Sequence, residues 1–167
     1  DWTLGSRPFL TGRGPLAGRL RDALAVHGPR IAMPGPLPLD RMTQAHLDHD
    51  MLVLVSANEG SPVVVMEAMA QGRPVAITRG CGGALRAVRD GVEGLIVDVG
   101  DMDATAAELA EVARDPTRLA RMSVSAYESA REHFDLASIA GRYDELVDEA
   151  ADAPDHPAGS IGLQWDR

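Results

Sequence analysis

The chain has 167 residues, of which 45% are hydrophobic and 25% charged, and this composition is ordinary for one soluble globular domain. Its formal net charge of −9 disfavours a nucleic-acid partner, because phosphate backbones are bound by clustered cations. All 16 basic residues are arginines, which excludes Schiff-base chemistry and a P-loop lysine, and the single cysteine, Cys81, excludes an internal disulfide.

Targeting signals do not stand out in this sequence. There is no charged start followed by an apolar core and a cleavage site, and the apolar runs are far shorter than a membrane span. We therefore expect a cytoplasmic protein. The first residue is Asp1 instead of methionine, which we interpret as the start of a fragment or of a processed piece.

Short runs rich in β-branched residues alternate with longer segments of helical period. This alternation is typical of βα units and a parallel sheet. The predicted strands are residues 8–11, 30–33, 51–55, 74–78 and 94–97. We expect an α/β fold in which one Rossmann-like parallel sheet is flanked by helices.

The helices are predicted from apolar periodicity and from capping residues. Asp101 is a suitable N-cap, and Pro116 is suited to the first turn of a further helix. The predicted helices are 16–27, 39–48, a short one at 84–89, one after Asp101, one from Pro116, and 136–150. From Ala151 the sequence is rich in Ala, Asp, Pro and Gly, so we expect one domain over 1–150 and a flexible tail over 151–167.

The stretch EGSPVVVMEAMAQGRPVA places Glu59 and Glu67 eight positions apart around three valines. Propensity alone favours a strand for the valines. However, Ser61 and Pro62 form a suitable N-cap and first helical residue, and Gly72 is suited to the position after a helix end. We therefore predict a loop that leads into a helix.

Glu67 lies four residues after Val63 and three after Val64, so these side chains share one helix face and Glu67 is expected to be partly buried. A buried unpaired carboxylate costs several kcal/mol, so an arginine or a pair of ligand hydroxyls should meet it. Glu59 lies in the loop at the carboxyl end of a strand, where open α/β sheets bind ligands. The first-turn amides of Val63 and Val64 can bind an anion. A nucleotide sugar offers both hydroxyls and phosphates.

The run SANEGSPVVVMEAMAQGRPVAIT, followed by CGGALRAVRDGVEGLIVDVGD, resembles the C-terminal donor-binding domain of family 4 retaining glycosyltransferases with the GT-B fold. Glu59 and Glu67 match the E-x7-E motif of that family. The similarity includes LTGRGPLAGRL and RIAMPG upstream and REHFDLASIAGRYDELVDEA downstream, so it covers about residues 7–150. The resemblance implies that 1–150 is a nucleotide-sugar-binding domain, the C-terminal half of a GT-B architecture, incomplete at its N-terminus.

The resemblance also implies roles for individual residues. Glu59 would be the catalytic residue that faces the donor sugar, and Glu67 would accept hydrogen bonds from the ribose hydroxyls. The other substrate-binding positions would contact the sugar and diphosphate through the backbone (Gly60, Ser61, Val63 and Val64) or hold the edge of the nucleobase (Gly35 and Leu37).

The expected activity is retaining transfer of a hexosyl group from a nucleotide-diphosphate sugar, with no metal cofactor. The acceptor is a glycan, a lipid or a small molecule, and the resemblance implies that its site lies in a missing N-terminal GT-B domain, together with the basic residues for the diphosphate. We expect this chain to be inactive by itself. Peripheral association of the full-length enzyme with the membrane is left as an open alternative. The alternative is a non-catalytic remnant that acts at most as a nucleotide-sugar or protein interaction module.

Other groups of polar residues are assigned structural or surface roles and no part in catalysis or metal binding. The acidic triplets at 48–50 and 101–103 are not placed as metal sites should be, and the second is typical of a helix start. His46 and His49 have a spacing found in zinc sites, but we predict that they are solvated at a polar helix end. For Arg86 a surface position is favoured over a phosphate contact.

Overall fold

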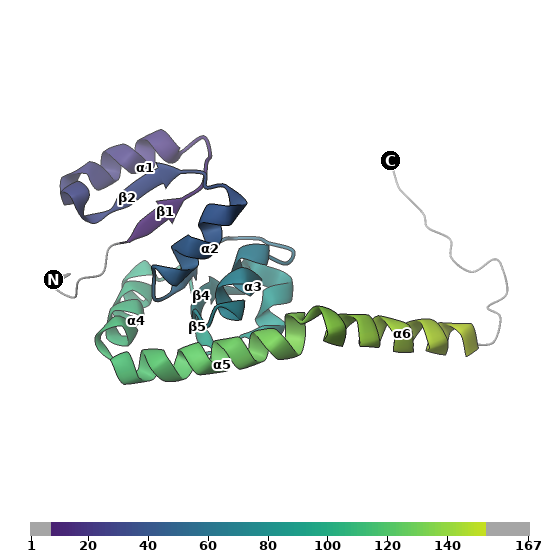
Figure 1. Ribbon diagram of the computed structural model, residues 1–167. Coiled ribbons are helices and arrows are strands. Elements are labelled where there is room, and N and C mark those ends of the chain that lie inside the picture. The colour runs from purple at the N-terminus through teal and green to yellow at the C-terminus, as the bar shows by residue number, and fades with distance from the viewer. Residues whose placement is uncertain (1–7, 153–167) are drawn as a thin grey trace.

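The computed structural model describes residues 8–152 and confirms the α/β class with parallel strands flanked by helices (Figure 1). The strands are β1 (Phe9–Thr11), β2 (Ala32–Gly35), β3 (Leu52–Leu54), β4 (Val75–Thr78) and β5 (Gly94–Val97). The predicted tail lies outside the described residues from 153 onward, whereas Ala151 and Asp152 still belong to the last helix. Within the described range, no helix is long and apolar enough to span a membrane.

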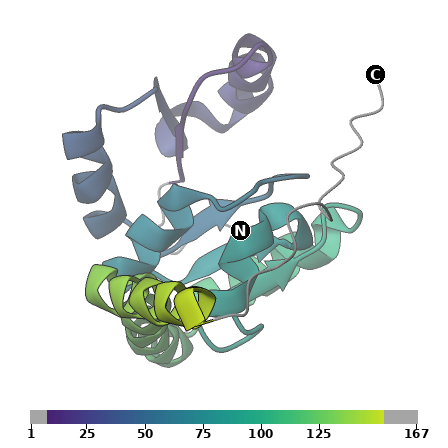
Figure 2. The same ribbon diagram turned by 90° about the vertical axis from the view of Figure 1, so that its right-hand side faces the viewer.

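The strands form two parallel sheets and not the single sheet that was predicted. β1 pairs with β2, and β3, β4 and β5 pair in that order. Figures 1 and 2 show the β1–β2 pair and its helix set apart from the three-stranded sheet. If β1 and β2 are taken as strands 2 and 3, and β3, β4 and β5 as strands 4, 5 and 6, these pairings match the doubly wound strand order 3-2-1-4-5-6. The position between β1 and β3 holds no strand within residues 8–152, so each sheet has a free edge.

The free edge of β3 is unusual for its sequence. The apolar run MLVLV is typical of a parallel strand that is covered on all sides. In the described chain, however, β3 pairs with β4 alone, and Val53 and Val55 remain 47% and 42% exposed. An apolar edge of this kind is a natural site for pairing with a further strand.

The helices confirm the local signals at two starts. Asp101 caps α4 by accepting a hydrogen bond from the Ala104 N–H at 2.9 Å, and Pro116 is the first residue of α5. The predicted helix at 84–89 is instead the end of a 3₁₀ segment that begins at Arg79. The α-helices are α1 (Ala17–Leu24), α2 (Leu39–Leu47), α3 (Val63–Ala70), α4 (Met102–Arg114), α5 (Pro116–Phe134) and α6 (Leu136–Asp152), and the 3₁₀ segments are η1 (Ala25–Arg30) and η2 (Arg79–Ala87).

The core lies on both faces of β4, whose four residues are all buried. Successive side chains of a strand point to opposite faces. Accordingly, Val75 and Ile77 pack with α3, η2 and the C-terminal part of α5, and Ala76 packs with β5, α4 and the N-terminal part of α5. α3 is thus held between β4 and α5, which gives the segment that carries Glu67 a rigid support.

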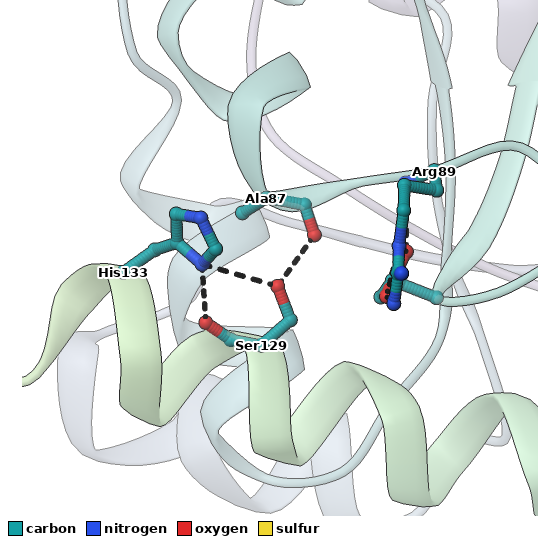
Figure 3. A network of polar contacts seen from close by, with 5 residues as sticks. Ala87, Arg89, Ser129 and His133 are labelled. Atoms are coloured by element: carbon teal, nitrogen blue, oxygen red, sulfur yellow. Dashed lines mark hydrogen bonds and ion pairs between the residues drawn. The ribbon is translucent and has the colours of Figure 1, made fainter.

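Polar contacts hold the end of η2 and the segment after it at two points (Figure 3). The Ser129 hydroxyl of α5 donates to the Ala87 carbonyl at 2.7 Å, beside the ring of His133. The Arg89 backbone N–H donates to the Glu93 carboxylate at 2.7 Å, and the Arg89 guanidinium pairs with the same carboxylate. Glu93 is 1% exposed, so these bonds compensate for the burial of its charge.

The stability of the domain should depend on the ionisation of Glu93. Burial by itself raises the pKa of Glu93, but the hydrogen bonds from the side chain and backbone of Arg89, with its charge, bring the pKa below its ordinary value of 4.5. The unfolded chain therefore takes up the proton first, and the stabilisation present above pH 4.5 is lost as the pH falls below that value. We expect the free energy of unfolding, measured in urea between pH 7 and pH 3, to fall less steeply with acid in Glu93→Gln than in the wild type.

A control for this measurement is Glu145→Gln on α6, whose side chain is exposed. Its pH dependence should follow that of the wild type. Parallel curves for Glu93→Gln and Glu145→Gln would contradict the assignment of the acid effect to Glu93.

Candidate functional site

Glu59 is held at the carboxyl end of β3 by its backbone and by its side chain. The Ser56 hydroxyl donates to Glu59 Oε1 at 2.9 Å, and the Glu59 N–H donates to the Gly80 carbonyl at 2.7 Å. One residue further on, the Gly83 N–H donates to the Gly60 carbonyl at 2.7 Å. The loop after β3 is therefore joined to η2, which follows the neighbouring strand β4.

This close approach needs the glycines of η2. A Cβ atom at Gly80 would overlap the backbone of Ala57, and one at Gly82 would overlap the carbonyl groups of Glu59 and Gly60. Gly82 also has a φ of +39°, which side chains rarely allow. The sequence interpretation did not assign these glycines to the site, although the run RGCGG directly after an apolar strand is a signal for close backbone contact.

α3 begins one residue later than predicted. Pro62, with an extended backbone, occupies the N-cap position, and no side chain caps the helix, so the N-cap role predicted for Ser61 is wrong. The predicted end is confirmed, since the helix stops at Ala70 and Gly72 has a φ of +67°. Gly60 and Ser61 are exposed, and Val63 is 61% exposed, so the start of the helix faces solvent.

Glu67 is half-buried, with 33% of its side chain exposed, as its position on α3 predicted. The side chain beside it is not an arginine but His46 of α2, whose Nε2 lies 3.9 Å from Glu67 Oε2, and the contact with ligand hydroxyls stays a prediction. His46 is 7% exposed, so the prediction that it is solvated is wrong. His49 is half-buried, with Nδ1 2.7 Å from the Ala45 carbonyl and its ring 5.1 Å from that of Phe9.

The spacing of α2 contains the signal that was missed. Met42, Ala45, His46 and His49 are its more buried residues and follow the i, i+3, i+4, i+7 pattern of one helix face. The two histidines therefore lie on the packed face of the helix. Burial lowers the pKa of His46 below its ordinary value of 6.5, and this effect outweighs the charge and hydrogen bonding of Glu67. The imidazole is thus neutral at neutral pH and can donate one N–H.

The remaining predicted positions lie elsewhere. Gly35 ends β2 with a φ of +87°, and its carbonyl accepts a hydrogen bond from the Thr11 hydroxyl at 2.8 Å. Leu37 is half-buried in the loop that leads to α2. Gly35 thus lies at the end of the two-stranded sheet and Leu37 just after it, and their role at a nucleobase stays a prediction. Arg86 is exposed, as predicted, with its guanidinium 6.0 Å from the centre of the Phe134 ring.

Metal-ligand clusters are not found among residues 8–152, where no three His, Cys, Asp or Glu side chains gather closely enough to hold an ion. In the first acidic triplet, the Asp48 carboxylate accepts a hydrogen bond from the Gln44 side chain at 2.7 Å. In the second, Asp101 caps α4, as predicted for an acidic helix start.

The fold defines the class of protein. The chain superposes on Anabaena Alr3699/HepE in complex with UDP-glucose with a TM-score of 0.71 and 24% identity, over 84% of this chain and 40% of that one. It also superposes on the C-terminal domain of the glycosyl transferase group 1 family protein LpcC from Francisella tularensis, with a TM-score of 0.65 and 18% identity, over 71% of this chain and 62% of that one. These similarities show the fold of a C-terminal GT-B glycosyltransferase domain.

Sequence similarity defines the family. Residues 11–129 match the model of the glycosyl transferases group 1, and the chain belongs to this family. The D-inositol 3-phosphate glycosyltransferase of Thermobispora bispora is 37% identical over 120 residues, which are 72% of this chain and 28% of that protein. The lipopolysaccharide core biosynthesis glycosyltransferase LpsE of Rhizobium meliloti is 32% identical over 98 residues, 59% of this chain and 28% of that protein. The chain thus spans less than a third of the length of these relatives.

Replacing Gly82 should disturb the contact between the two loops. In Gly82→Ala, the added methyl group overlaps the carbonyls of Glu59 and Gly60. The φ of residue 82 is also positive, which an alanine disfavours. Backbone strain of roughly 1–3 kcal/mol and overpacking of a similar size should together lower the free energy of unfolding by about 2–6 kcal/mol. Urea denaturation of the purified variant measures this loss.

The matched control is Gly141→Ala in α6, where an added Cβ meets nothing within 4 Å. Since glycine is unfavourable inside a helix, this variant should be more stable by roughly 0.5–1 kcal/mol. A Gly82→Ala protein as stable as Gly141→Ala would show that the loops do not need this close approach.

Proposed function

We propose that this chain is the donor-binding domain of a retaining glycosyltransferase of family 4, which binds a nucleotide-diphosphate sugar and serves in transfer of its hexosyl group. The observation that carries the proposal is the pair of carboxylates on either side of the α3 start. Glu59 is held just before the helix and Glu67 lies half-buried in its second turn. Carboxylates suit sugar hydroxyls, and a helix start suits phosphates.

The start of α3 offers the groups that a diphosphate needs. The Val65 N–H bonds to the Pro62 carbonyl at 3.1 Å, whereas the amides of Val63 and Val64 have no earlier helical carbonyl to bond. In the proposal these amides, with the backbone of Gly60 and Ser61, bind the diphosphate and the sugar. Glu67 accepts hydrogen bonds from the two ribose hydroxyls.

The same groups would serve the reaction. In a retaining transfer, the bond between the anomeric carbon and the diphosphate oxygen breaks, the acceptor oxygen bonds to that carbon from the same face, and the acceptor's hydroxyl proton passes to the departing diphosphate. Negative charge grows on the leaving diphosphate, and the helix dipole stabilises it by roughly 0.3–2 kcal/mol. The Glu59 carboxylate, as the catalytic residue, faces the sugar where positive charge develops. The proposal assigns no step to a metal ion.

The ligands of structural neighbours support this choice of donor. Anabaena Alr3699/HepE has been crystallised in complex with UDP-glucose and with UDP and glucose, and the pneumococcal O-GlcNAc transferase GtfA in complex with UDP and GlcNAc. UDP and its sugars are therefore the first ligands to test. In the proposal, Gly35 and Leu37 hold the edge of the nucleobase.

We further propose that the domain is completed by a strand from a preceding segment of the full-length protein, which also carries the N-terminal GT-B domain. The free edges of β1 and β3 support this, because they are the two edges that flank the first strand in the order 3-2-1-4-5-6. The site for the acceptor, whether glycan, lipid or small molecule, and the basic residues for the diphosphate belong to that segment. A cytoplasmic location fits nucleotide-sugar chemistry.

Hydrogen exchange tests the missing strand. Leu52 donates its N–H to Pro74 of the β4 segment at 3.1 Å, so the N–H of the next residue, Val53, points to the free edge. In this chain the Val53 amide should exchange quickly, and in the full-length protein about tenfold or more slowly. The Ala76 amide in β4, which is paired on both sides, should be slow in both. A Val53 amide equally exposed in the longer protein would contradict the added strand.

Calorimetric titration tests the donor site. With UDP, GDP and their sugars, we expect binding by the wild type and a loss of roughly 1.5–3 kcal/mol in Glu67→Ala, the scale of a charged hydrogen bond. Glu145→Ala on α6 is the control and should bind as the wild type does. No heat from any of these ligands with folded protein would contradict the proposed function. Binding without sugar transfer in the full-length protein would instead identify a non-catalytic module.

A further inference from the structure

His46 has an unsatisfied ring nitrogen directed at the candidate site. α2 packs on α3, and this contact buries His46 to 7% exposure. Its Nε2 is buried and has no hydrogen-bond partner, and the carboxylate oxygen Oε2 of Glu67 lies 3.9 Å away. A buried polar atom without a partner is costly, so its retention next to a carboxylate requires an explanation.

The surroundings of His46 favour a neutral donor. The charged and titratable groups that influence it are Glu67 on α3, Arg73 in the segment after α3, and His49 on its own helix. The Arg73 guanidinium is engaged with the Leu47 carbonyl at 3.0 Å. The positive charge of Arg73 and the burial of the ring both oppose protonation of His46, which leaves an imidazole that can donate one N–H to the carboxylate.

We propose that His46 is a positioning residue for the ribose subsite: when a ribonucleotide binds, Oε2 of Glu67 closes the 3.9 Å separation, accepts a hydrogen bond from the His46 Nε2–H and is fixed for the two ribose hydroxyls. This inference rests on the proposed function of Glu67. A carboxylate has about four lone-pair sites. One hydrogen bond from His46 on its buried side therefore leaves enough acceptor sites for two hydroxyls on its solvent side. Because the ring of His46 is already packed beside the carboxylate, little further ordering is needed when the nucleotide binds.

A merely space-filling histidine would behave differently on substitution. His46→Phe keeps an aromatic ring of similar size and removes the donor. His46→Gln keeps an N–H donor at the position of Nε2. A packing role would favour Phe over Gln, whereas a positioning role requires the opposite order for recognition of the ribose.

The experiment compares a ribonucleotide with its 2′-deoxy counterpart. Calorimetry gives the Kd of UDP and of 2′-deoxy-UDP, or of GDP and 2′-deoxy-GDP if GDP binds more tightly, and their ratio isolates the ribose hydroxyl contact. We expect His46→Phe to lower this preference for the ribonucleotide by about three- to tenfold, as loss of one hydrogen bond predicts. His46→Gln should keep it within about twofold. His49→Asn, on the same helix but against Phe9, should leave it unchanged.

A second measurement does not depend on the folding of a variant. In the wild type, the ¹⁵N resonance of His46 Nε2 should shift on saturation with the ribonucleotide and shift less with the deoxy form. An unchanged preference in His46→Phe, or an Nε2 resonance that does not respond to the ribonucleotide, would overturn the inference.

The two levels of the proposal fail in different ways. If the wild type binds neither nucleotide, or if Glu67→Ala keeps the full preference for the ribonucleotide, the ribose assignment of Glu67 fails and the role of His46 fails with it. If Glu67→Ala abolishes the preference and His46→Phe preserves it, the donor site stands and His46 is a packing residue.

Discussion

The candidate site depends on the two backbone hydrogen bonds that join the loop after β3 to η2. The Glu59 N–H bonds to Gly80, and the Gly83 N–H bonds to the Gly60 carbonyl. Each bond is local in space but links segments that follow two different strands, so it can form only when β3 and β4 are paired. The glycines of η2 allow the approach because a Cβ at Gly80 or Gly82 would occupy the same space as the opposite backbone. The direction of Glu59 is therefore a consequence of the pairing of the sheet.

The two glutamates differ in what surrounds them, and the difference follows from their elements. Glu59 lies in a loop and is met by the hydroxyl of Ser56, three residues earlier. Glu67 lies on α3, whose buried residues pack against β4 and α5. The side chain beside Glu67 therefore comes from a third element, α2, and is His46. In both cases the nearest polar group is neutral: the Ser56 hydroxyl donates to Glu59, and the His46 ring lies 3.9 Å from Glu67. An arginine would have neutralised the charge, whereas a hydroxyl or a neutral imidazole leaves it available for a ligand.

Local signals in the sequence predicted most of the elements, whereas the site also depends on contacts between segments that are distant in the sequence. β5 begins and ends where the alternation of apolar residues and turns predicted, and the starts of α4 and α5 follow from Asp101 and Pro116. The start of α3 was one residue off because Ser61 and Pro62 both suit a helix start. The division into two sheets and the burial of His46 depend on which segments meet in space. Only the face pattern of α2 hinted at the latter, and it was outweighed by the polar residues around it.

α2 is the element that relates the two sheets at this site. Its His49 ring packs against Phe9 of β1, and one turn earlier its His46 faces Glu67 of α3. The loop with Gly35 and Leu37 leads from β2 directly into the same helix. If those residues hold the nucleobase and Glu67 holds the ribose, the position of α2 sets the distance between the two subsites. A nucleoside, whose base and ribose are joined by one covalent bond, would then be recognised by the packing of one helix against both sheets.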